Sequence, residues 1–253
     1  MSAQIVYLSH GGGPLPLLGD AGHRVMVRFM QDLGDLLRRP KAIVVFSAHW
    51  EERRPAVIVE EKPGLLYDYY GFPPESYAYE YPAVSDVALA RRIVGLLEGE
   101  EKSGRGWDHG VFIPLMLAFS DASIPIVQVS QLRSLDAGEH YRMGEQLRSL
   151  LEEEILFIGS GFSFHNMRAF GERDDERNGA FQEYLITACT HADASVQKQM
   201  LIDWQSAPAA RYCHPREEHL LSLHICAGLA QSAGRVIFDD VIMGKRGTAY
   251  LWG

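Results

Sequence analysis

Three histidines follow, within a few residues, short apolar runs that are typical of buried strands. In chain order they are His10 after residues 5–8, His49 after residues 43–46 and His165 after residues 155–158. Open α/β sheets bind their ligands beyond the carboxyl ends of such strands. Because imidazole is the commonest protein ligand for a catalytic metal, the three positions predict a metal site. The alternative is that each is a packed, hydrogen-bonded histidine, and the residue pattern alone leaves both interpretations open.

A further pair of candidate ligands begins the predicted helix at residues 215–231, where Glu218 stands beside His219. Apolar residues lie almost all round this helix, so periodicity does not decide which of the two side chains faces a site. Pro215 is suited to the first helical position. His214 precedes it and is interpreted as a loop residue or as a support for the site.

Three further histidines lie on predicted helices among polar neighbours and are expected to be solvated: His23, His140 and His191. His224 is instead expected to be packed in the interior.

The stretch at residues 66–82 contains six tyrosines and three prolines. So many prolines exclude a central strand. The stretch is either an ordered surface loop held by aromatic packing or the wall of an aromatic pocket.

The elements expected to position these residues alternate between strands and helices, which indicates a layered α/β domain. Short apolar runs predict strands at residues 4–8, 43–46, 56–59, 124–129, 155–158, 236–241 and 248–252. Apolar residues at helical spacing predict helices at 22–37, 84–97, 111–119, 136–151, 179–191, 195–204 and 215–231. Asp136 is expected to cap its helix. Residues 99–106 and 171–178 are expected to be charged loops.

The composition limits the class of protein. The chain has 253 residues, a formal net charge of −9 and 47% hydrophobic residues, enough for a substantial core. The acidic balance argues against nucleic acid or an anionic membrane surface as a partner. Three widely spaced cysteines form neither a disulfide framework nor a CxxC metal site, which predicts a cytoplasmic location. The N-terminus lacks a signal-peptide pattern, and no apolar stretch of about 18 residues predicts a membrane span.

Six short motifs occur in order along the chain. They are SHGGGP at 9–14, SAHW at 47–50, YDYYGFP at 67–73, DHGVFIPL at 108–115, HNMR at 165–168 and HPREEH at 214–219. Together they resemble the class III extradiol ring-cleavage dioxygenase superfamily (LigB-like), and most of all its DOPA 4,5-dioxygenase-type branch. The resemblance implies a single extradiol dioxygenase-like catalytic domain over residues 1–253. Its fold would be α/β, with a central mixed β-sheet and helices on both faces.

The resemblance also implies roles for individual histidines. A metal, Fe(II) or Zn(II) at one per chain, would be held by His10, His49 and His219. His165 would act as the acid/base residue beside the metal, or as a fourth ligand in a resting zinc form. His109 would line the substrate pocket and take part in catalysis.

On the substrate side, the resemblance implies that the loop at residues 67–73 shapes the pocket, with Tyr70 and Phe72 as substrate contacts. Arg168 is our own candidate partner for a substrate carboxylate, and it is not a family assignment.

The chain departs from the better-known members of the superfamily, which use two histidines and a carboxylate. Here the matching position is His219, and a three-histidine site also suits zinc. Glu218 and His214 are then expected to support the ligands from behind. Phe162 and Phe164 stand where small or hydroxylated residues are expected, which predicts a narrower pocket.

The function expected from this resemblance is extradiol cleavage of a DOPA-like catechol with O₂ to a muconic semialdehyde. Fe(II) with three protein ligands leaves positions open for the diol and O₂. The alternatives are a zinc-dependent hydrolase, with Glu218 or His165 as base, and a non-catalytic metal-binding protein. The expected partners are a small aromatic diol and O₂, without nucleic acid or membrane. The expected assembly is a monomer or a small homo-oligomer.

Overall fold

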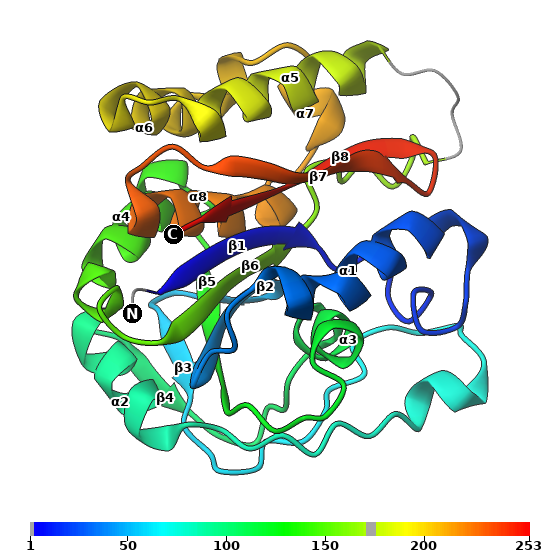
Figure 1. Ribbon diagram of the computed structural model, residues 1–253, viewed down its shortest axis with the longest axis vertical. Helices are drawn as coiled ribbons and strands as arrows, with labels where there is room; N and C mark the ends of the chain where they lie inside the picture. Colours follow the sequence, from blue (N-terminus) through cyan, green and yellow to red (C-terminus); the bar gives the residue numbers. More distant parts are fainter. Residues whose placement is uncertain (1–2, 171–175) are drawn as a thin grey trace.

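A mixed eight-stranded sheet forms the centre of the computed structural model, which describes residues 3–170 and 176–253 (Figure 1). The strand order is β4-β3-β5-β2-β6-β1-β8-β7. The strands are β1 Gln4–Ser9, β2 Ala42–Glu52, β3 Ala56–Ile58, β4 Glu100–Lys102, β5 Ile126–Leu132, β6 Ile155–Gly161, β7 Arg235–Ile242 and β8 Lys245–Trp252. The four central strands β5, β2, β6 and β1 run parallel, while β8 and β3 pair antiparallel with β1 and β5. The predicted mixed-sheet α/β fold is confirmed.

Helices cover both faces of this sheet (Figure 1). They are α1 Arg24–Leu36, α2 Val87–Leu96, α3 His109–Ala118, α4 Ala137–Gln146, α5 Glu176–Thr190, α6 Ala194–Ile202, α7 Ala210–Cys213 and α8 Glu218–Ala230. Short 3₁₀ helices occupy Ala21–His23, Pro74–Tyr77, Arg148–Leu150 and Trp204–Ser206. Helices α8 and α4 pack together on one face, and α3 packs with α1 on the other.

Strand β6 shows how the two layers approach the sheet. Because successive residues of a strand point to opposite faces, Gly159 and Gly161 face α8 while Ser160 faces α3. A Cβ atom on either glycine would collide with the α8 backbone at Ser222 or His219. These glycines therefore let the N-terminal end of α8 lie against the carboxyl end of β6.

Strand β2 extends further than the apolar run predicts, because it continues to Glu52. Its pairing with β6 ends at Ser47, and its register with β5 shifts between Phe46 and Glu51. His49 therefore lies inside an irregular part of the strand, and the prediction that it follows the strand end was wrong. Such irregularities re-aim side chains, and they are common beside active sites.

Several helices begin at other residues than predicted, among them α2 at Val87 instead of residue 84. Helix α8 begins at Glu218, three residues after Pro215, which lies in the preceding turn. Helix α3 begins at His109, two residues earlier than predicted. The side chain of Asp136 accepts a hydrogen bond from the backbone N–H of Glu139, so its predicted capping role is confirmed.

The two predicted charged loops differ in outcome. Residues 100–102 of the first form the short edge strand β4. Residues 171–175 of the second lie outside the described residues, and α5 already begins at Glu176.

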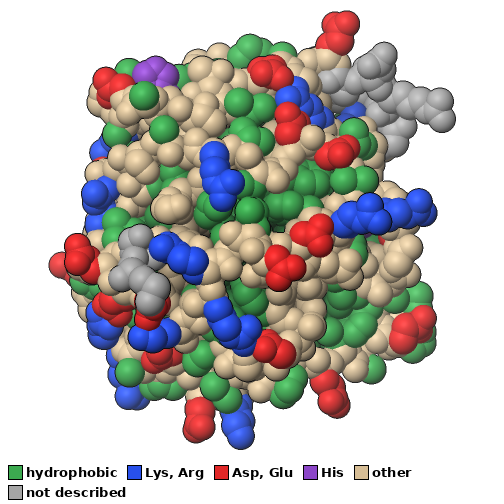
Figure 2. All heavy atoms as spheres, in the orientation of Figure 1, with side chains coloured by type: hydrophobic (Ala, Val, Ile, Leu, Met, Phe, Trp, Pro, Cys, Tyr) green, Lys and Arg blue, Asp and Glu red, His purple; other side chains and the backbone are tan. Residues whose placement is uncertain are grey.

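Acidic and basic side chains are interspersed over the face seen in Figure 2. Among the described residues, no helix combines the length and the apolar character that crossing a membrane requires.

Candidate active site

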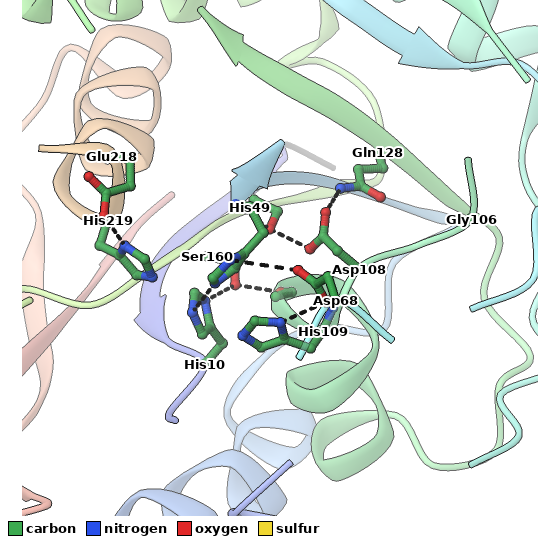
Figure 3. A network of polar contacts seen from close by, with 12 residues as sticks. His10, His49, Asp68, Gly106, Asp108, His109, Gln128, Ser160, Glu218 and His219 are labelled. Atoms are coloured by element: carbon green, nitrogen blue, oxygen red, sulfur yellow. Dashed lines mark hydrogen bonds and ion pairs between the residues drawn. The ribbon is translucent and has the colours of Figure 1, made fainter. Parts of the chain in front are cut away.

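Three histidines from separate elements converge at the carboxyl edge of the parallel strands. The Nε2 atoms of His10, after β1, and His49, in β2, are 3.0 Å apart. His219, in the first turn of α8, completes a group whose ligand atoms all lie within 4.8 Å of one another (Figure 3). The structure thus brings together the three residues that the sequence marks as candidate metal ligands.

Hydrogen bonds fix which nitrogen of two of these rings is free. Nδ1 of His10 lies 2.9 Å from Oγ of Ser160, and that hydroxyl donates its own proton to the carbonyl of Gly110 at 2.5 Å. His10 must therefore donate through Nδ1. Nδ1 of His219 lies 3.0 Å from Oε1 of Glu218, an acceptor only. Both rings thus keep an unprotonated Nε2 for a ligand, which is how metal-binding histidines are oriented.

Burial keeps these imidazoles uncharged. Removal from water lowers the pKa of His10 and His49 well below the usual value and that of His219 to about 4, and the neighbouring imidazoles add to the effect. At neutral pH each ring is neutral and offers its lone pair. A cluster of neutral nitrogen donors with oriented rings fits a transition metal such as Fe(II) or Zn(II).

Glu218 stands behind this cluster, between His219 and His165. Its Oε1 lies 3.1 Å from Nδ1 of His165, and the ring of His165 stacks on that of His219 at 3.4 Å. Burial alone would raise the pKa of Glu218, but the hydrogen bonds from His165 and His219 hold it well below the usual range. The sequence leaves the choice between Glu218 and His219 open, and the structure groups His219 with His10 and His49. Glu218, His165 and His219 form a second set of neighbouring ligand atoms.

His109, at the start of α3, borders the three-histidine cluster. The ring of His109 lies 3.9 Å from that of His49, and its Nδ1 is 2.7 Å from Oδ1 of Asp68. Oδ2 of the same carboxylate lies 3.7 Å from Nδ1 of His49. Burial raises the pKa of Asp68, but the hydrogen bonds from His109 outweigh it and keep the carboxyl ionised. No role for Asp68 was predicted from the sequence, although it is the only charged residue in the YDYYGFP motif.

A fully buried carboxylate, Asp108, anchors the start of α3. It accepts a hydrogen bond from Nε2 of Gln128 at 2.5 Å (Figure 3). It also accepts one from Oγ of Ser47 at 2.6 Å and pairs with Arg105 at 3.1 Å. Because Ser47 lies in β2 and Gln128 in β5, this network fixes α3, and with it His109, against two strands.

A cavity of about 510 Å³ opens over the histidines. His165 and His109 line it together with the three converging histidines. Its other walls are mainly apolar and come from Leu15, Tyr69, Tyr70, Phe72, Phe162, Met167, Phe170 and Met243. The aromatic stretch at residues 66–82 thus contributes a wall of the cavity that contains the histidines, as the pocket interpretation predicts.

Comparison with known proteins agrees with this geometry. Residues 21–248 match the family described as "Catalytic LigB subunit of aromatic ring-opening dioxygenase". The chain belongs to this family of ring-cleaving dioxygenases. It is 42% identical to dioxygenase tasH of Hapsidospora irregularis, over 99% of this chain and 86% of that protein.

Other relatives carry more specific names. The 4,5-DOPA dioxygenase extradiol of Beta vulgaris is 34% identical over 88% of this chain and 85% of that protein. The Escherichia coli K12 protein of the same name is 35% identical over 86% and 82%. A crystal structure of an uncharacterized Escherichia coli K12 protein superposes with a TM-score of 0.80 at 30% identity, covering 99% of both chains.

Membership of the LigB family implies an aromatic substrate, O₂ and a bound metal. It favours the dioxygenase over the zinc hydrolase and the non-catalytic metal-binding protein, which were the alternatives left by the sequence.

Some residues singled out from the sequence lie away from the cavity of this LigB-family chain. Arg168 is exposed, is not among the lining residues, and donates its backbone N–H to Oδ1 of Asn166. Phe164 packs against Phe170 and Tyr212, so only Phe162 of the two phenylalanines lines the cavity.

His214 is buried behind the site, where its Nε2 lies 3.0 Å from the carbonyl oxygen of Ser163. Its ring packs against Phe181 and Trp204.

Two histidines that were expected to be solvated are buried, so that expectation was wrong. His23 pairs with Asp20 through Nδ1 at 2.7 Å and accepts the backbone N–H of Gly12 at Nε2. His140 accepts the N–H of Leu132. Their polar sequence neighbours are on the solvent side of each helix, while the imidazoles satisfy buried backbone groups. His23 thereby holds the glycine loop beside His10.

Proposed function

We propose that this protein is a metal-dependent extradiol dioxygenase that opens the ring of a catechol with O₂ and forms a muconic semialdehyde. The observation that carries the proposal is the position of His109 and His165. Each borders the three-histidine cluster, lines the same cavity and is oriented by its own carboxylate. The site thus has separate residues for holding a metal and for moving protons, and ring cleavage requires both.

The proposed metal is Fe(II), one per chain, held by His10, His49 and His219, with Zn(II) as the alternative that an all-histidine donor set leaves open. When bound, Fe(II) would favour the ionised diol and hold it close to O₂.

His165 is proposed to accept a hydroxyl proton of the catechol at Nε2 and to return it as the ring opens. Its Nδ1 faces Oε1 of Glu218, which accepts the Nδ1–H and leaves Nε2 as the acceptor. A fourth-ligand role is the alternative for His165, but its ring stacks on His219 and its Nδ1 pairs with Glu218.

His109 is proposed to accept a hydrogen bond at Nε2 from a substrate hydroxyl, since its Nδ1–H is donated to Asp68. In the overall reaction the carbon–carbon bond beside the diol breaks, both atoms of O₂ enter the product, and no external reductant is consumed.

The test is to load the metal-free protein with Fe(II) without oxygen, and then to add O₂ and a panel of catechols. The expected result is a yellow product that contains both atoms of isotopically labelled O₂, seen by absorbance and mass spectrometry. A parallel sample loaded with Zn(II) should take up no O₂. Absence of O₂ uptake by the Fe(II) protein with every catechol would exclude the proposed function.

A further inference from the structure

The cavity is larger than the diol chemistry needs. Its volume of about 510 Å³ lies within the roughly 300–1,000 Å³ that pockets for drug-sized ligands occupy. A bare catechol lying on the three histidines would leave the outer part of this space without a ligand.

The outer walls are aromatic or aliphatic and come from three segments. Tyr70 and Phe72 lie in the loop before α2, Met167 and Phe170 follow β6, and Met243 lies in the turn between β7 and β8. Tyr70 and Met167 are 91% and 70% exposed, the highest values among the large hydrophobic side chains of the described residues. Exposed apolar groups gathered at a cavity mouth indicate a surface that a ligand covers.

The lining of the cavity, as far as the chain is described, contains no lysine or arginine that could pair with a substrate carboxylate. The backbone N–H groups of Gly11 and Gly12 already donate to Oγ of Ser9 and Nε2 of His23. The lining carboxylate, Asp68, would repel a second anion and already accepts hydrogen bonds from His109.

Arginines near the site are committed to other partners. Arg105 contacts Asp108 at 3.1 Å and donates to the carbonyl of His49 at 3.0 Å. Arg216 forms a two-bond ion pair with Glu51, at 2.7 Å for each bond.

We propose that the ring-cleavage substrate is a diol with an extended apolar substituent, rather than an amino acid or another carboxylate. This inference rests on the proposed function, and it differs from the amino-acid substrate in the names of two relatives. The diol would lie on the histidines, and its substituent would extend between the loop at residues 69–72 and the segment at residues 162–170. Its contacts with Tyr70 and Met167 would cover their exposed apolar surface.

The test compares 4-alkylcatechols of increasing chain length with DOPA and dihydrocaffeate, which carry a carboxylate. Each buried methylene should raise kcat/KM about fourfold over the first few carbons. Anaerobic calorimetry on the Fe(II) protein should show the same dependence in Kd, independently of turnover. DOPA and dihydrocaffeate should bind more weakly than 4-propylcatechol.

Variants assign the effect to the apolar wall. Met167→Lys should lower kcat/KM for the long alkylcatechols and raise it for dihydrocaffeate, because it places a cation at the mouth. Val196→Lys is the matched control, since it adds the same charge at an exposed valine on α6 outside the cavity, and it should change neither value. Arg168→Met should leave the preference between the two substrate types unchanged. A selective loss of dihydrocaffeate activity in that variant would overturn the inference.

The two proposals can fail separately. Cleavage of 4-methylcatechol without any gain from longer chains would overturn the substrate inference and leave the dioxygenase proposal in place. Tighter binding of longer alkylcatechols without O₂ uptake would support the apolar wall and reject the dioxygenase proposal.

Discussion

Oδ1 of Asp68 accepts two hydrogen bonds from His109, one from Nδ1 at 2.7 Å and one from the backbone N–H at 3.0 Å. Because an ionised carboxylate only accepts, Nδ1 carries the proton and Nε2 is the free nitrogen of this ring. The two residues are 41 positions apart in the sequence, so this relationship exists only in the folded protein.

Asp68→Asn should lower turnover by about 10–100-fold, the usual effect of losing a partner that orients a functional histidine. The amide oxygen is a weaker acceptor than a carboxylate, and the NH₂ group can face His109 instead of the oxygen. Steady-state kinetics with a catechol would measure the loss. Glu75→Gln removes an exposed carboxylate from the 3₁₀ helix Pro74–Tyr77 that follows the loop, and it should have no effect. Equal losses in both variants would assign the effect to the loop as a whole.

Changing His10, His49 or His219 to Ala should each remove most of the bound metal, because each takes one of three proposed donors from the cluster. Elemental analysis after equilibration with Fe(II) or Zn(II) would measure it. His191→Ala, at a histidine beyond the end of α5, should keep full occupancy. Retention of metal by all three cluster variants would contradict the ligand assignment.

His165→Ala and His165→Gln should keep bound metal and catechol while losing turnover by about 10²–10⁴-fold, since neither side chain can exchange a proton near neutral pH. Single-turnover kinetics and metal analysis on the same samples would separate the two effects. Metal loss as severe as in His10→Ala would instead make His165 a fourth ligand. Undiminished turnover would show that His165 has only a structural role.

Ser160→Ala should weaken metal binding by about 10–100-fold, because Oγ of Ser160 accepts the Nδ1–H of His10 and fixes its ring. Competition with a metal chelator would measure the change in affinity. Ser222→Ala is a matched control in α8, where a buried serine hydroxyl has no hydrogen-bond partner among the described residues. The idea fails if the two variants bind metal equally well.

His214→Phe should make the metal-free protein less sensitive to acid. Burial lowers the pKa of His214 to about 3, so below about pH 6.5 the unfolded chain takes up a proton that the folded protein excludes. This residue therefore reduces the free energy of unfolding as the pH falls from about 6.5 to about 3, by up to roughly 5 kcal/mol in total, and has no such effect above pH 6.5.

Urea unfolding at several pH values would measure the slope of the free energy of unfolding against pH. This slope should be smaller in His214→Phe than in the parent protein. The carbonyl of Ser163, which loses the contact with His214, keeps its hydrogen bond from Gln182. The ring of phenylalanine also suits the contacts with Phe181 and Trp204. His191→Phe should leave the slope unchanged, and a slope as steep as that of the parent in His214→Phe would show that His214 does not titrate in this way.

Most strands of the central sheet and two of the candidate ligands could be predicted from local residue patterns. Short apolar runs define β1, β2 and β6, and parallel strands bring their carboxyl ends to one edge. His10 and His49 follow those runs within a few residues, so the local pattern was enough to place them together. It also identified the aromatic stretch as a possible pocket wall.

Which of His219 and Glu218 joins His10 and His49 depends on how α8 packs. Adjacent residues of a helix point in different directions, and on a buried helix periodicity does not say which direction faces the sheet edge. The contact of α8 with Gly161 of β6 sets that direction. The burial of His23 also could not be predicted from its sequence neighbours, since its hydrogen-bond partner Gly12 lies on a different segment of the chain. The pairing of Asp68 with His109 likewise depends on how a loop packs against α3, a long-range contact that no sequence period encodes.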